Sequence, residues 1–581
     1  MQPAVLLHIA AGAALVLAAW LAPRRIARAG IAPIGVMLLD AAPFALGAAL
    51  LAVATGRPLF VGVVVAALGA GFCLADHTMR ETLREPVVFS EAVELPQLFT
   101  HPHLYLPFAG PVLVLGGALT ALSAAVGLLI FEPPVSQPRP LVALAAVALI
   151  AAGLGVASRE QPVAIAARIL RRIARPSGEP VADAAALGPF AMLIVHAVIA
   201  RAERSLRRRQ FAVGCASPQP YPCESVAKAA DRKSRHTDPD YVASRLSAGP
   251  RHAKTGRAGT PVPADPIIIV QCESFFDARR LSPAIPPELL AGFAACCASS
   301  ARYGRLAVPG WGANTMRAEF AVLTGIPETE LGYDRFNPYY ALARAPLESH
   351  VRRLRRAGYR TICLHPFDRR FFRRDLAMPA LGFERFLGRE TLGGSRTPPY
   401  YPDPDLARDI LRIVDREGPR TFVFAITMGN HGPWLAKGPP IDPDIAALFD
   451  PSDIPDGAGL LRYLDGMKRS DMMLQILIGE LERRGRPAVA AFYGDHLPSL
   501  PRAFAHFGFA ETSADYVIWN GGGAAERRDI PAHQLGQAAI AAALAVPPSG
   551  AHESGQSAAV WESWPNPAPA GLVPNYKRAI D

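Results

Sequence analysis

The sequence predicts two kinds of domain in one chain: a multi-pass α-helical membrane domain, followed by a soluble α/β domain whose mainly parallel sheet lies between helices. Two observations indicate this fold class. Five long apolar stretches follow one another near the N-terminus, and after residue 265 apolar runs of strand length alternate with helical patterns. With 581 residues, 50 % of them hydrophobic, the chain is long enough for several domains and too apolar to be disordered throughout.

Each of the five apolar stretches approaches the length of about 20 residues that a helix needs to cross a bilayer. They run approximately over residues 4–21, 31–54, 58–75, 107–130 and 140–157. Asp40 is the exception to their lack of charge, and we expect it to face the interior of the helix bundle. The first stretch does not read as a signal peptide, because no basic residue precedes Val5 and further spans follow. We therefore predict an integral membrane protein.

Arginines are distributed unequally between the two ends of these spans. One side carries Arg57 and Arg139, and the other carries Arg24, Arg25, Arg28, Arg80, Arg84, Arg159, Arg168, Arg171, Arg172 and Arg175. The positive-inside rule places the second side in the cytoplasm. A further apolar run, residues 184–200, either crosses the membrane a sixth time or forms an interfacial helix, so charge alone leaves the number of crossings open.

The segment after the spans changes in character. Residues 201–263 are polar, basic and rich in Pro and Ser, which is typical of a tether that rests on anionic head groups. The patterns predict four segments: a transmembrane domain over 1–160, interfacial helices and a basic flexible linker over 161–263, an α/β domain over 264–546, and a Pro-rich tail over 547–581.

Charge and cysteine content restrict the function. The net charge is +10, but the basic residues do not gather in one domain, which argues against nucleic-acid binding. None of the seven cysteines forms a CxxC or a zinc-finger spacing. Cys215 and Cys223 either pair in an oxidising compartment or remain free thiols.

Four predicted strands are each followed at once by residues capable of chemistry. In parallel sheets the ligand site lies beyond the carboxyl ends of the strands, so these residues are expected to meet at one edge. The strands and following residues are IIIVQ (267–271) before Cys272-Glu273-Ser274, RTICL (360–364) before His365, TFVFAIT (421–427) before Gly429-Asn430-His431-Gly432, and AVAAFY (488–493) before Gly494-Asp495-His496. Helical patterns lie between the strands at 287–299, 346–357, 404–416 and 459–484.

Glu273, Asp495 and His496 form a ligand set of oxygens and an imidazole, which suits Mn²⁺, Mg²⁺ or Zn²⁺. Gly494 permits the turn that points both following side chains at one ion. Thr315 opens a helical pattern (MRAEFAVLTG), and a hydroxyl near a helix N-terminus and a divalent cation becomes a usable nucleophile toward phosphorus. Alternatively, Asn314 or Thr315 is only an N-cap.

Five motifs together resemble the lipoteichoic acid synthase and phosphoglycerol transferase family, which belongs to the alkaline phosphatase and sulfatase superfamily. The motifs are ESFFD (273–277), GANTMRAEFAVLTGI (312–326), HPFDRRFFRRD (365–375), GNHGPW (429–434) and GDHLPSL (494–500). The resemblance covers roughly residues 265–545, and the five preceding spans fit the same architecture. It implies an alkaline phosphatase/sulfatase-like fold for the α/β domain.

The resemblance also implies roles for individual residues. It implies a metal, Mn²⁺ before Mg²⁺ or Zn²⁺, held by Glu273, Thr315, Asp495 and His496. Thr315 is the implied nucleophile, and His431 is placed to assist proton transfer. The implied substrate contacts are His431, Arg374, which holds the phosphate, and His365, near the glycerol hydroxyls. Phe372 is a departure, because the lipoteichoic acid enzymes carry a tryptophan there, so one hydrogen bond to glycerol is lost.

The function implied is a membrane-bound phosphoglycerol transferase that moves glycerol phosphate from phosphatidylglycerol to an extracytoplasmic glycan or envelope polymer through a phospho-threonine-type intermediate. The family places the catalytic domain outside the bacterial inner membrane, periplasmic in a two-membrane envelope, after five spans. That side is opposite to the one that the arginine count favours. We follow the family, treat residues 184–200 as interfacial, and expect the loop 77–107 to lie against the entrance of the site, although it equally suits a plain interfacial connection.

Three other functions fit parts of the same pattern. A sulfatase needs Cys or Ser in a CxPxR setting, and Thr315 occupies that position instead. A phosphoethanolamine transferase shares the five spans, the threonine and the metal, so it is the main alternative. A non-catalytic membrane scaffold or transporter-associated protein is the third, and the complete set of metal and nucleophile residues argues against it.

Overall fold

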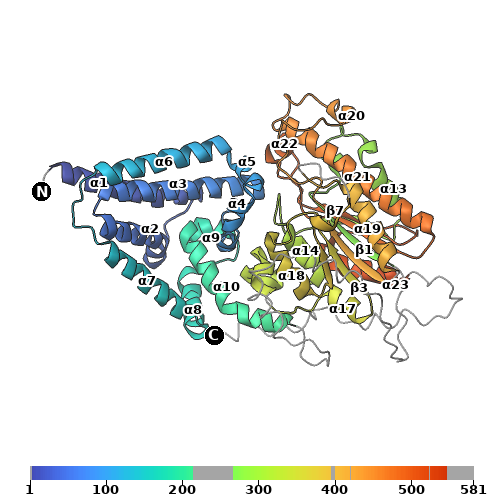
Figure 1. The fold of residues 1–581 in the computed structure, drawn as a ribbon, viewed down its shortest axis with the longest axis horizontal. Helices are drawn as coiled ribbons and strands as arrows, with labels where there is room; N and C mark the ends of the chain where they lie inside the picture. The colour runs from blue at the N-terminus through green and yellow to red at the C-terminus, as the bar shows by residue number, and fades with distance from the viewer. Residues whose placement is uncertain are drawn as a thin grey trace.

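The computed structural model describes residues 3–212, 266–343, 345–393, 400–418, 420–522 and 524–545. The hypothesis of a Cys215–Cys223 pair and the predicted tail over 547–581 lie outside these residues. Figure 1 shows a helical part formed by the first half of the chain beside an α/β part formed by the second half, with helix α10 (Pro189–Phe211) running from one to the other.

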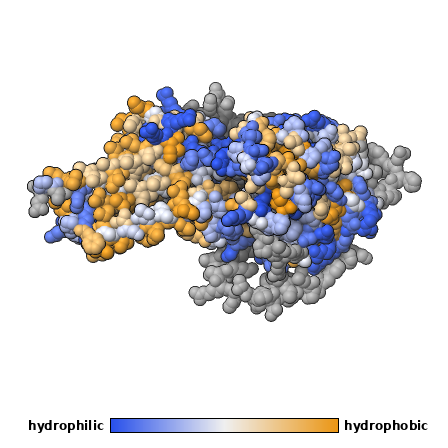
Figure 2. Space-filling view, turned by 90° about the horizontal axis from the view of Figure 1, so that it is seen from above, coloured by the Kyte–Doolittle hydropathy of each residue, from blue (hydrophilic) through white to orange (hydrophobic). Residues whose placement is uncertain are grey.

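The five predicted spans are confirmed as five helices long and apolar enough to cross a membrane. They are α1 (Pro3–Ile26), α2 (Ile34–Thr55), α3 (Pro58–Leu83), α6 (Pro111–Phe131) and α7 (Pro140–Ala157). Figure 2 shows a largely hydrophobic surface over this part of the molecule and a mixed, more hydrophilic one over the α/β part. Helix α3 extends beyond its apolar stretch with polar residues and ends at Leu83. In Figure 1 this C-terminal end points toward the α/β part.

Asp40 lies inside the helical part, as predicted, and is fully buried. Its Oδ2 atom accepts hydrogen bonds of 2.8 Å from Trp20 Nε1 and from Arg24 Nη1. Its Oδ1 atom accepts from the backbone N–H groups of Phe190 and Ala191, at 2.9 Å each. These two groups belong to the first turn of α10, which has no intrahelical acceptor for them, so Asp40 ties α2 to the start of α10.

The connection between α3 and α6 is a chain of short helices on the side of the α/β part. It consists of η1 (Phe89–Val93), α4 (Leu95–Thr100), η2 (Pro102–Leu104) and α5 (Leu106–Ala109). In Figure 1, α4 and α5 lie at the end of α3 that faces the α/β part.

The run 184–200 is divided between α9 (Pro180–Leu187) and the first half of α10, and it is not among the five candidate spans of the described chain. Helix α10 packs against α2 and α8 (Glu160–Ala174). It then continues to Phe211, past Arg201, where the sequence pattern placed the start of the tether. The extension is folded because Arg204 and Arg207 pair with the buried carboxylate of Asp334 in the α/β part.

A nine-stranded sheet forms the centre of the α/β part, with the order β4-β3-β5-β1-β6-β7-β2-β8 and β9 beside β2. The four predicted strands are neighbours in it: β3 (Arg360–Leu364), β5 (Thr421–Ile426), β1 (Ile267–Cys272) and β6 (Val489–Gly494). They are mutually parallel, whereas β7 (Ala514–Trp519) is antiparallel to both β6 and β2 (Arg302–Ala307). The remaining strands are β4 (Arg385–Leu387), β8 (Glu526–Arg527) and β9 (Ile530–Pro531).

Helices cover the sheet in two groups. One group contains α13 (Ala291–Ala298), α19 (Asp403–Glu417) and α21 (Gly457–Arg484), and the other contains α14 (Thr315–Thr324), α17 (His350–Arg356) and α23 (Ala532–Ala545). This confirms the predicted mainly parallel sheet between helices, with fully buried central strands. The shorter elements are η3 (Ala278–Arg280), η4 (Pro287–Leu290), α15 (Glu328–Leu331), η5 (Gly332–Phe336), α16 (Pro338–Leu342), η6 (Phe371–Arg373), α18 (Arg374–Leu381), η7 (Arg389–Thr391), α20 (Pro443–Ala446) and α22 (Pro501–His506).

Candidate active site

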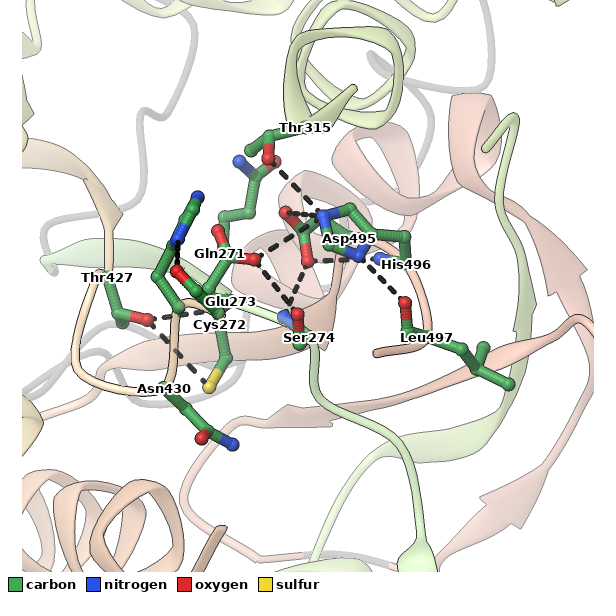
Figure 3. Close-up of polar contacts among 12 residues, drawn as sticks. Gln271, Cys272, Glu273, Ser274, Thr315, Thr427, Asn430, Asp495, His496 and Leu497 are labelled. Atoms are coloured by element: carbon green, nitrogen blue, oxygen red, sulfur yellow. Dashed lines mark hydrogen bonds and ion pairs between the residues drawn. The ribbon is translucent and has the colours of Figure 1, made fainter. Parts of the chain in front are cut away.

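Three of the predicted ligands meet where the parallel strands β1 and β6 end. Glu273 follows β1, Asp495 and His496 follow β6, and their ligand atoms lie within 4.8 Å of one another. His496 Nε2 is 3.4 Å from Glu273 Oε1 and 3.4 Å from Asp495 Oδ2. Figure 3 shows the two carboxylates and the imidazole pointing toward one another. Adjacent parallel strands bring these residues together because their carboxyl ends share one edge of the sheet.

Neighbouring groups hold each of the three ligands in place. The backbone N–H of Ser274 donates to Asp495 Oδ1 at 2.9 Å, and the Ser274 hydroxyl donates to Glu273 Oε1 at 2.9 Å. His496 Nδ1 is 3.0 Å from the carbonyl oxygen of Leu497, which accepts its proton. That bond fixes the tautomer in which Nε2, the nitrogen facing the carboxylates, keeps a free lone pair.

The three residues fit a divalent cation. Asp495 Oδ2 is buried and has no hydrogen-bond partner among the described residues, an arrangement that is costly unless a positive ligand faces it. Burial and the negative charge of Asp495 raise the pKa of Glu273 to about 8. A cation held by these residues would remove both penalties, and hard oxygens with one imidazole suit Mn²⁺, Mg²⁺ or Zn²⁺.

Thr315 is the first residue of α14 and lies beside this cluster. Its Oγ1 atom is 3.5 Å from His496 Nε2, and the residue is 7 % exposed. Asn314 stands at the N-cap position with φ +66° and makes no side-chain capping bond. Thr315 therefore occupies the first helical position, where its hydroxyl is directed at the cluster, as Figure 3 shows, and the interpretation of Asn314 as a capping side chain is wrong.

Arg374 is buried next to the cluster in an ion pair with Glu319. Arg374 Nε lies 3.0 Å from Glu319 Oε1, and Nη2 lies 2.9 Å from Oε2. Glu319 also accepts the hydroxyl proton of Tyr339 at 2.6 Å. Glu319 was not predicted from the sequence, although its position one helical turn after Thr315 was a signal that both residues share a face of α14.

His365 and Phe372 both contact Arg374. His365 Nε2 accepts from Arg374 Nη1 at 3.3 Å, which leaves Nδ1 to donate to the carbonyl oxygen of Ile426 at 3.4 Å. Burial and the neighbouring Arg374 hold the pKa of His365 well below its usual range, so the ring is neutral. The Arg374 guanidinium lies 5.3 Å from the centre of the Phe372 ring, which therefore shields it from solvent.

His431 lies in the loop that follows β5. Its Nδ1 donates to the carbonyl oxygen of Gly432 at 2.6 Å, and the Tyr400 hydroxyl lies 3.3 Å from the same nitrogen. Burial lowers the pKa of His431 below its usual value, so the imidazole is neutral at pH 7. Asp403, from α19, accepts the backbone N–H of Gly429 at 2.9 Å and thereby supports the loop.

One cavity of about 200 Å³ joins these groups to the membrane part of the molecule. On one side it is lined by Glu273, Thr315, His365, Phe372, Arg374, His431 and His496. The opposite wall comes from the end of α3 and the connection that follows, with Met79, Leu83, Glu91, Glu94, Tyr105 and Phe108. The expectation that the loop 77–107 lies at the entrance is confirmed, whereas the individual residues of this wall carried no recognisable sequence signal.

Gly494 is required for a reason other than the predicted one. Its φ is not in the left-handed region, so the turn before Asp495 does not depend on glycine's freedom. Instead, a Cβ atom on residue 494 would lie 1.7 Å from the carbonyl oxygen of Phe275. Glycine is needed because the backbone after β1 passes too close for any side chain.

Comparison with known proteins is consistent with this geometry. Residues 267–543 match the family model described as Sulfatase. The capsular polysaccharide biosynthesis protein RkpI of Rhizobium meliloti (strain 1021) is 35 % identical over 258 residues, which cover 44 % of this chain and 45 % of that protein. A putative cyclic beta-1,2-glucan modification protein of the same organism is 28 % identical over 268 residues, which cover 46 % of this chain and 40 % of that protein.

The chain thus spans less than half the length of these curated relatives. Among solved structures, the phosphoglycerol transferase GacH of Streptococcus pyogenes, in complex with sn-glycerol-1-phosphate, is 20 % identical with a TM-score of 0.37. That match covers 56 % of this chain and 86 % of GacH. The part of this chain that matches the Sulfatase family model, residues 267–543, contains every residue of the candidate site that the sequence motifs predicted.

Proposed function

We propose that the protein is a membrane-bound phosphoglycerol transferase that moves glycerol phosphate from phosphatidylglycerol to a glycan or envelope polymer outside the cell membrane. The observation that carries the proposal is the placement of a helix-terminal threonine hydroxyl 3.5 Å from His496 in a buried carboxylate–imidazole cluster. Sulfatase-family domains and this donor set suit phosphoryl or sulfuryl transfer, and Thr315 stands where a sulfatase needs Cys or Ser.

Glu273, Asp495, His496 and Thr315 are the residues that would hold a divalent cation. When bound, the cation acidifies a coordinated hydroxyl and offsets negative charge on a phosphodiester. Mn²⁺ is our first choice among the ions that the donor set accepts, ahead of Mg²⁺ and Zn²⁺. The positive end of α14 adds a partial positive charge at the same place, and Arg374, whose own charge is balanced by Glu319, lines the same cavity as a hydrogen-bond donor.

The proposed reaction is a double displacement at phosphorus. Thr315 Oγ1 forms a bond to the phosphorus atom, the bond from phosphorus to the diacylglycerol oxygen breaks, and diacylglycerol leaves with a proton. The product is a glycerophospho-threonine. An acceptor hydroxyl then attacks phosphorus, the bond from phosphorus to Thr315 Oγ1 breaks, and the proton of the acceptor hydroxyl restores the Thr315 hydroxyl. The neutral ring of His431, whose pKa is lowered by burial, is suited to accept the proton of the acceptor hydroxyl.

The position of the cavity supports a lipid donor. Met79, Leu83 and Phe108 give an apolar lining to the wall formed by the end of α3 and the connection that follows it. This lining continues from a membrane-spanning helix. A lipid head group therefore reaches the cluster without leaving the membrane surface. The two curated relatives are named for a capsular polysaccharide and a cyclic glucan, which makes a polysaccharide our preferred class of acceptor.

We place the α/β domain on the outer side of the membrane, although it lies at the arginine-rich ends of the spans. Several of these arginines are neutralised within the fold, because Arg24 pairs with Asp40, Arg80 with Asp76 and Arg171 with Glu203. These arginines therefore have a structural role in the fold, so their positions are not set by membrane orientation alone.

Phosphoethanolamine transfer is the second candidate function. Glu91 and Glu94 place two carboxylates on the membrane-side wall of the cavity, and carboxylates bind an ammonium group as well as hydroxyls. Burial raises the pKa of Glu91 to about 7, and Glu94 accepts a hydrogen bond of 2.8 Å from Asn337 Nδ2. Phosphatidylethanolamine is therefore the competing donor in any test.

The test is release of diacylglycerol by the purified full chain in nanodiscs that contain phosphatidylglycerol or phosphatidylethanolamine. We expect release from phosphatidylglycerol that stops when EDTA removes the metal and returns with Mn²⁺. Asp495→Asn abolishes it, whereas the same change at the exposed Asp415 leaves it intact. Release from phosphatidylethanolamine alone favours the second function, and no release from either lipid contradicts both.

A further inference from the structure

The C-terminal end of the membrane span α3 contacts the loop that carries Thr315. The carbonyl oxygen of Thr82 accepts a hydrogen bond of 2.9 Å from Ser499 Oγ, three residues after the ligand His496. The same carbonyl lies against Gly312, where a Cβ atom would come within 2.2 Å of it. The Arg84 guanidinium stacks 3.3 Å from the centre of the Trp311 ring. The nucleophile loop and the metal-ligand loop therefore share one support.

Glu85 makes the strongest of these contacts, with Arg317 in the first turn of α14. Arg317 Nη1 and Nη2 donate to Glu85 Oε1 and Oε2 at 2.9 and 3.0 Å, a bidentate pair. Arg317 is only 4 % exposed, and its third guanidinium nitrogen, Nε, donates to the carbonyl oxygen of Phe336 at 3.3 Å. Glu85 is the one carboxylate that pairs with this guanidinium among the described residues.

The ion pair between Glu85 and Arg317 stabilises mainly the first turn of α14. Breaking a buried ion pair by removing one partner leaves the other charge unpaired, which is strongly destabilising at that place. The first turn of a helix also lacks intrahelical acceptors for its N–H groups, so it frays unless side chains hold it. Arg317 lies two residues after Thr315, and anchoring its side chain restrains the turn that carries the threonine hydroxyl.

We propose that Glu85 is a positioning residue, which acts through Arg317 to hold the first turn of α14 and with it the Thr315 hydroxyl beside His496. The membrane span is then a structural part of the active site rather than a tether. The importance of Thr315 rests on the proposed function, whereas the effect of Glu85 on α14 does not. The two are therefore tested by different measurements.

The first measurement is hydrogen–deuterium exchange of the α14 amides in the purified full chain without donor lipid. Glu85→Gln keeps the shape of the side chain but removes its charge, and we expect exchange over residues 316–321 to become about tenfold faster or more. Glu85→Asp keeps the charge and recovers most of the protection. The matched control is Glu179→Gln, which removes a solvent-exposed ion pair with Arg335 between the same two parts of the molecule.

The second measurement separates positioning from general destabilisation. With phosphatidylglycerol as donor, Glu85→Gln is expected to lower kcat about tenfold or more with KM within about twofold, because a misplaced nucleophile slows the chemical step without weakening lipid binding. In an Arg317→Met background the same substitution is expected to have no further effect, since Glu85 acts through Arg317.

Unchanged exchange at α14 in Glu85→Gln overturns the proposal whatever the activity. An equal loss of protection in Glu179→Gln also overturns it. The faster exchange would then come from weaker contact between the membrane part and the α/β part as a whole, and not from the loss of Glu85. Faster exchange confined to α14 supports it even if the wild-type chain releases no diacylglycerol, in which case only the proposed function fails.

Discussion

Arg374 and Glu319 form a buried ion pair at the candidate site, with side chains 2 % and 0 % exposed. Glu319→Gln leaves the guanidinium without a charged partner, and we expect a loss of about 3 kcal/mol of stability. The expected result is a thermal unfolding midpoint several degrees lower in detergent. Glu330→Gln, which makes the same change on the nearby helix α15, is the control, and equal midpoints for the two variants contradict this role of the ion pair.

At the scale of single residues, the meeting of the candidate metal ligands was predictable and their supports were not. Glu273, Asp495 and His496 each follow a strongly apolar strand, so the topology of a parallel sheet brings them together. Glu319 and Glu85 occupy ordinary helical and loop sequence. Their partners lie 55 and 232 residues away in the chain, a separation that no local pattern encodes.

The turn between β6 and the candidate ligands Asp495 and His496 is the element on which the proposed metal binding depends most directly. Gly494→Ala places a methyl group 1.7 Å from the Phe275 carbonyl, so the turn must shift and Asp495 moves with it. We expect the affinity for Mn²⁺ to fall about tenfold or more.

Competition with a fluorescent chelator measures that affinity. Gly479→Ala on α21 is the matched control, because nothing lies within 4 Å of its Cβ position. If Gly494→Ala binds Mn²⁺ as tightly as the control, the close approach is not what makes glycine necessary.

Helix α19 supports the His431 loop through Asp403, whose pKa burial raises from 3.8 to about 6. The folded protein therefore holds this proton more tightly than the unfolded chain does. The resulting contribution to stability is present below about pH 4 and is lost as the pH rises to about 6, a change of about 3 kcal/mol. Asp403→Asn removes this dependence.

Thermal unfolding of the metal-free protein at about pH 4 and about pH 6 tests the prediction for Asp403. We compare the unfolding midpoint of Asp403→Asn with that of the wild type at each pH. The variant's midpoint minus that of the wild type is expected to increase by several degrees from the lower pH to the higher one. Asp405→Asn, on the same helix, is the control with a half-buried carboxylate. A relative midpoint of Asp403→Asn that stays constant or falls contradicts the predicted direction.

At the scale of elements, the periodic parts of the sequence were predicted well. Three kinds of element were recognisable: the spans, the four parallel strands and the long helices α19 and α21. Each has either an apolar face or a continuous apolar run in its sequence. The continuation of α10 to Phe211 was missed, since its basic composition resembles a linker. It is helical because Arg204 and Arg207 find a buried partner, Asp334, in the other part of the molecule.

At the scale of the whole molecule, the membrane helices and the α/β domain build one cavity together. Neither part contains the complete wall: Glu91 and Tyr105 belong to the first, and Thr315 and Arg374 to the second. The sequence motifs located the residues of the second half, whereas for the first half only the loop 77–107 was expected and not its individual residues. The first half depends on how two separately patterned regions dock, which hydrophobic periodicity does not describe.

The proposed function depends above all on Thr315 becoming covalently bound to the head group of a membrane lipid. Intact-mass analysis of the purified full chain with Mn²⁺ and phosphatidylglycerol detects that bond. We expect a glycerophosphate adduct on wild-type protein and on Thr315→Ser, and none on Thr315→Ala. An adduct that persists in Thr315→Ala, or diacylglycerol release by a wild-type chain in which no adduct forms even without acceptor, contradicts the proposed mechanism.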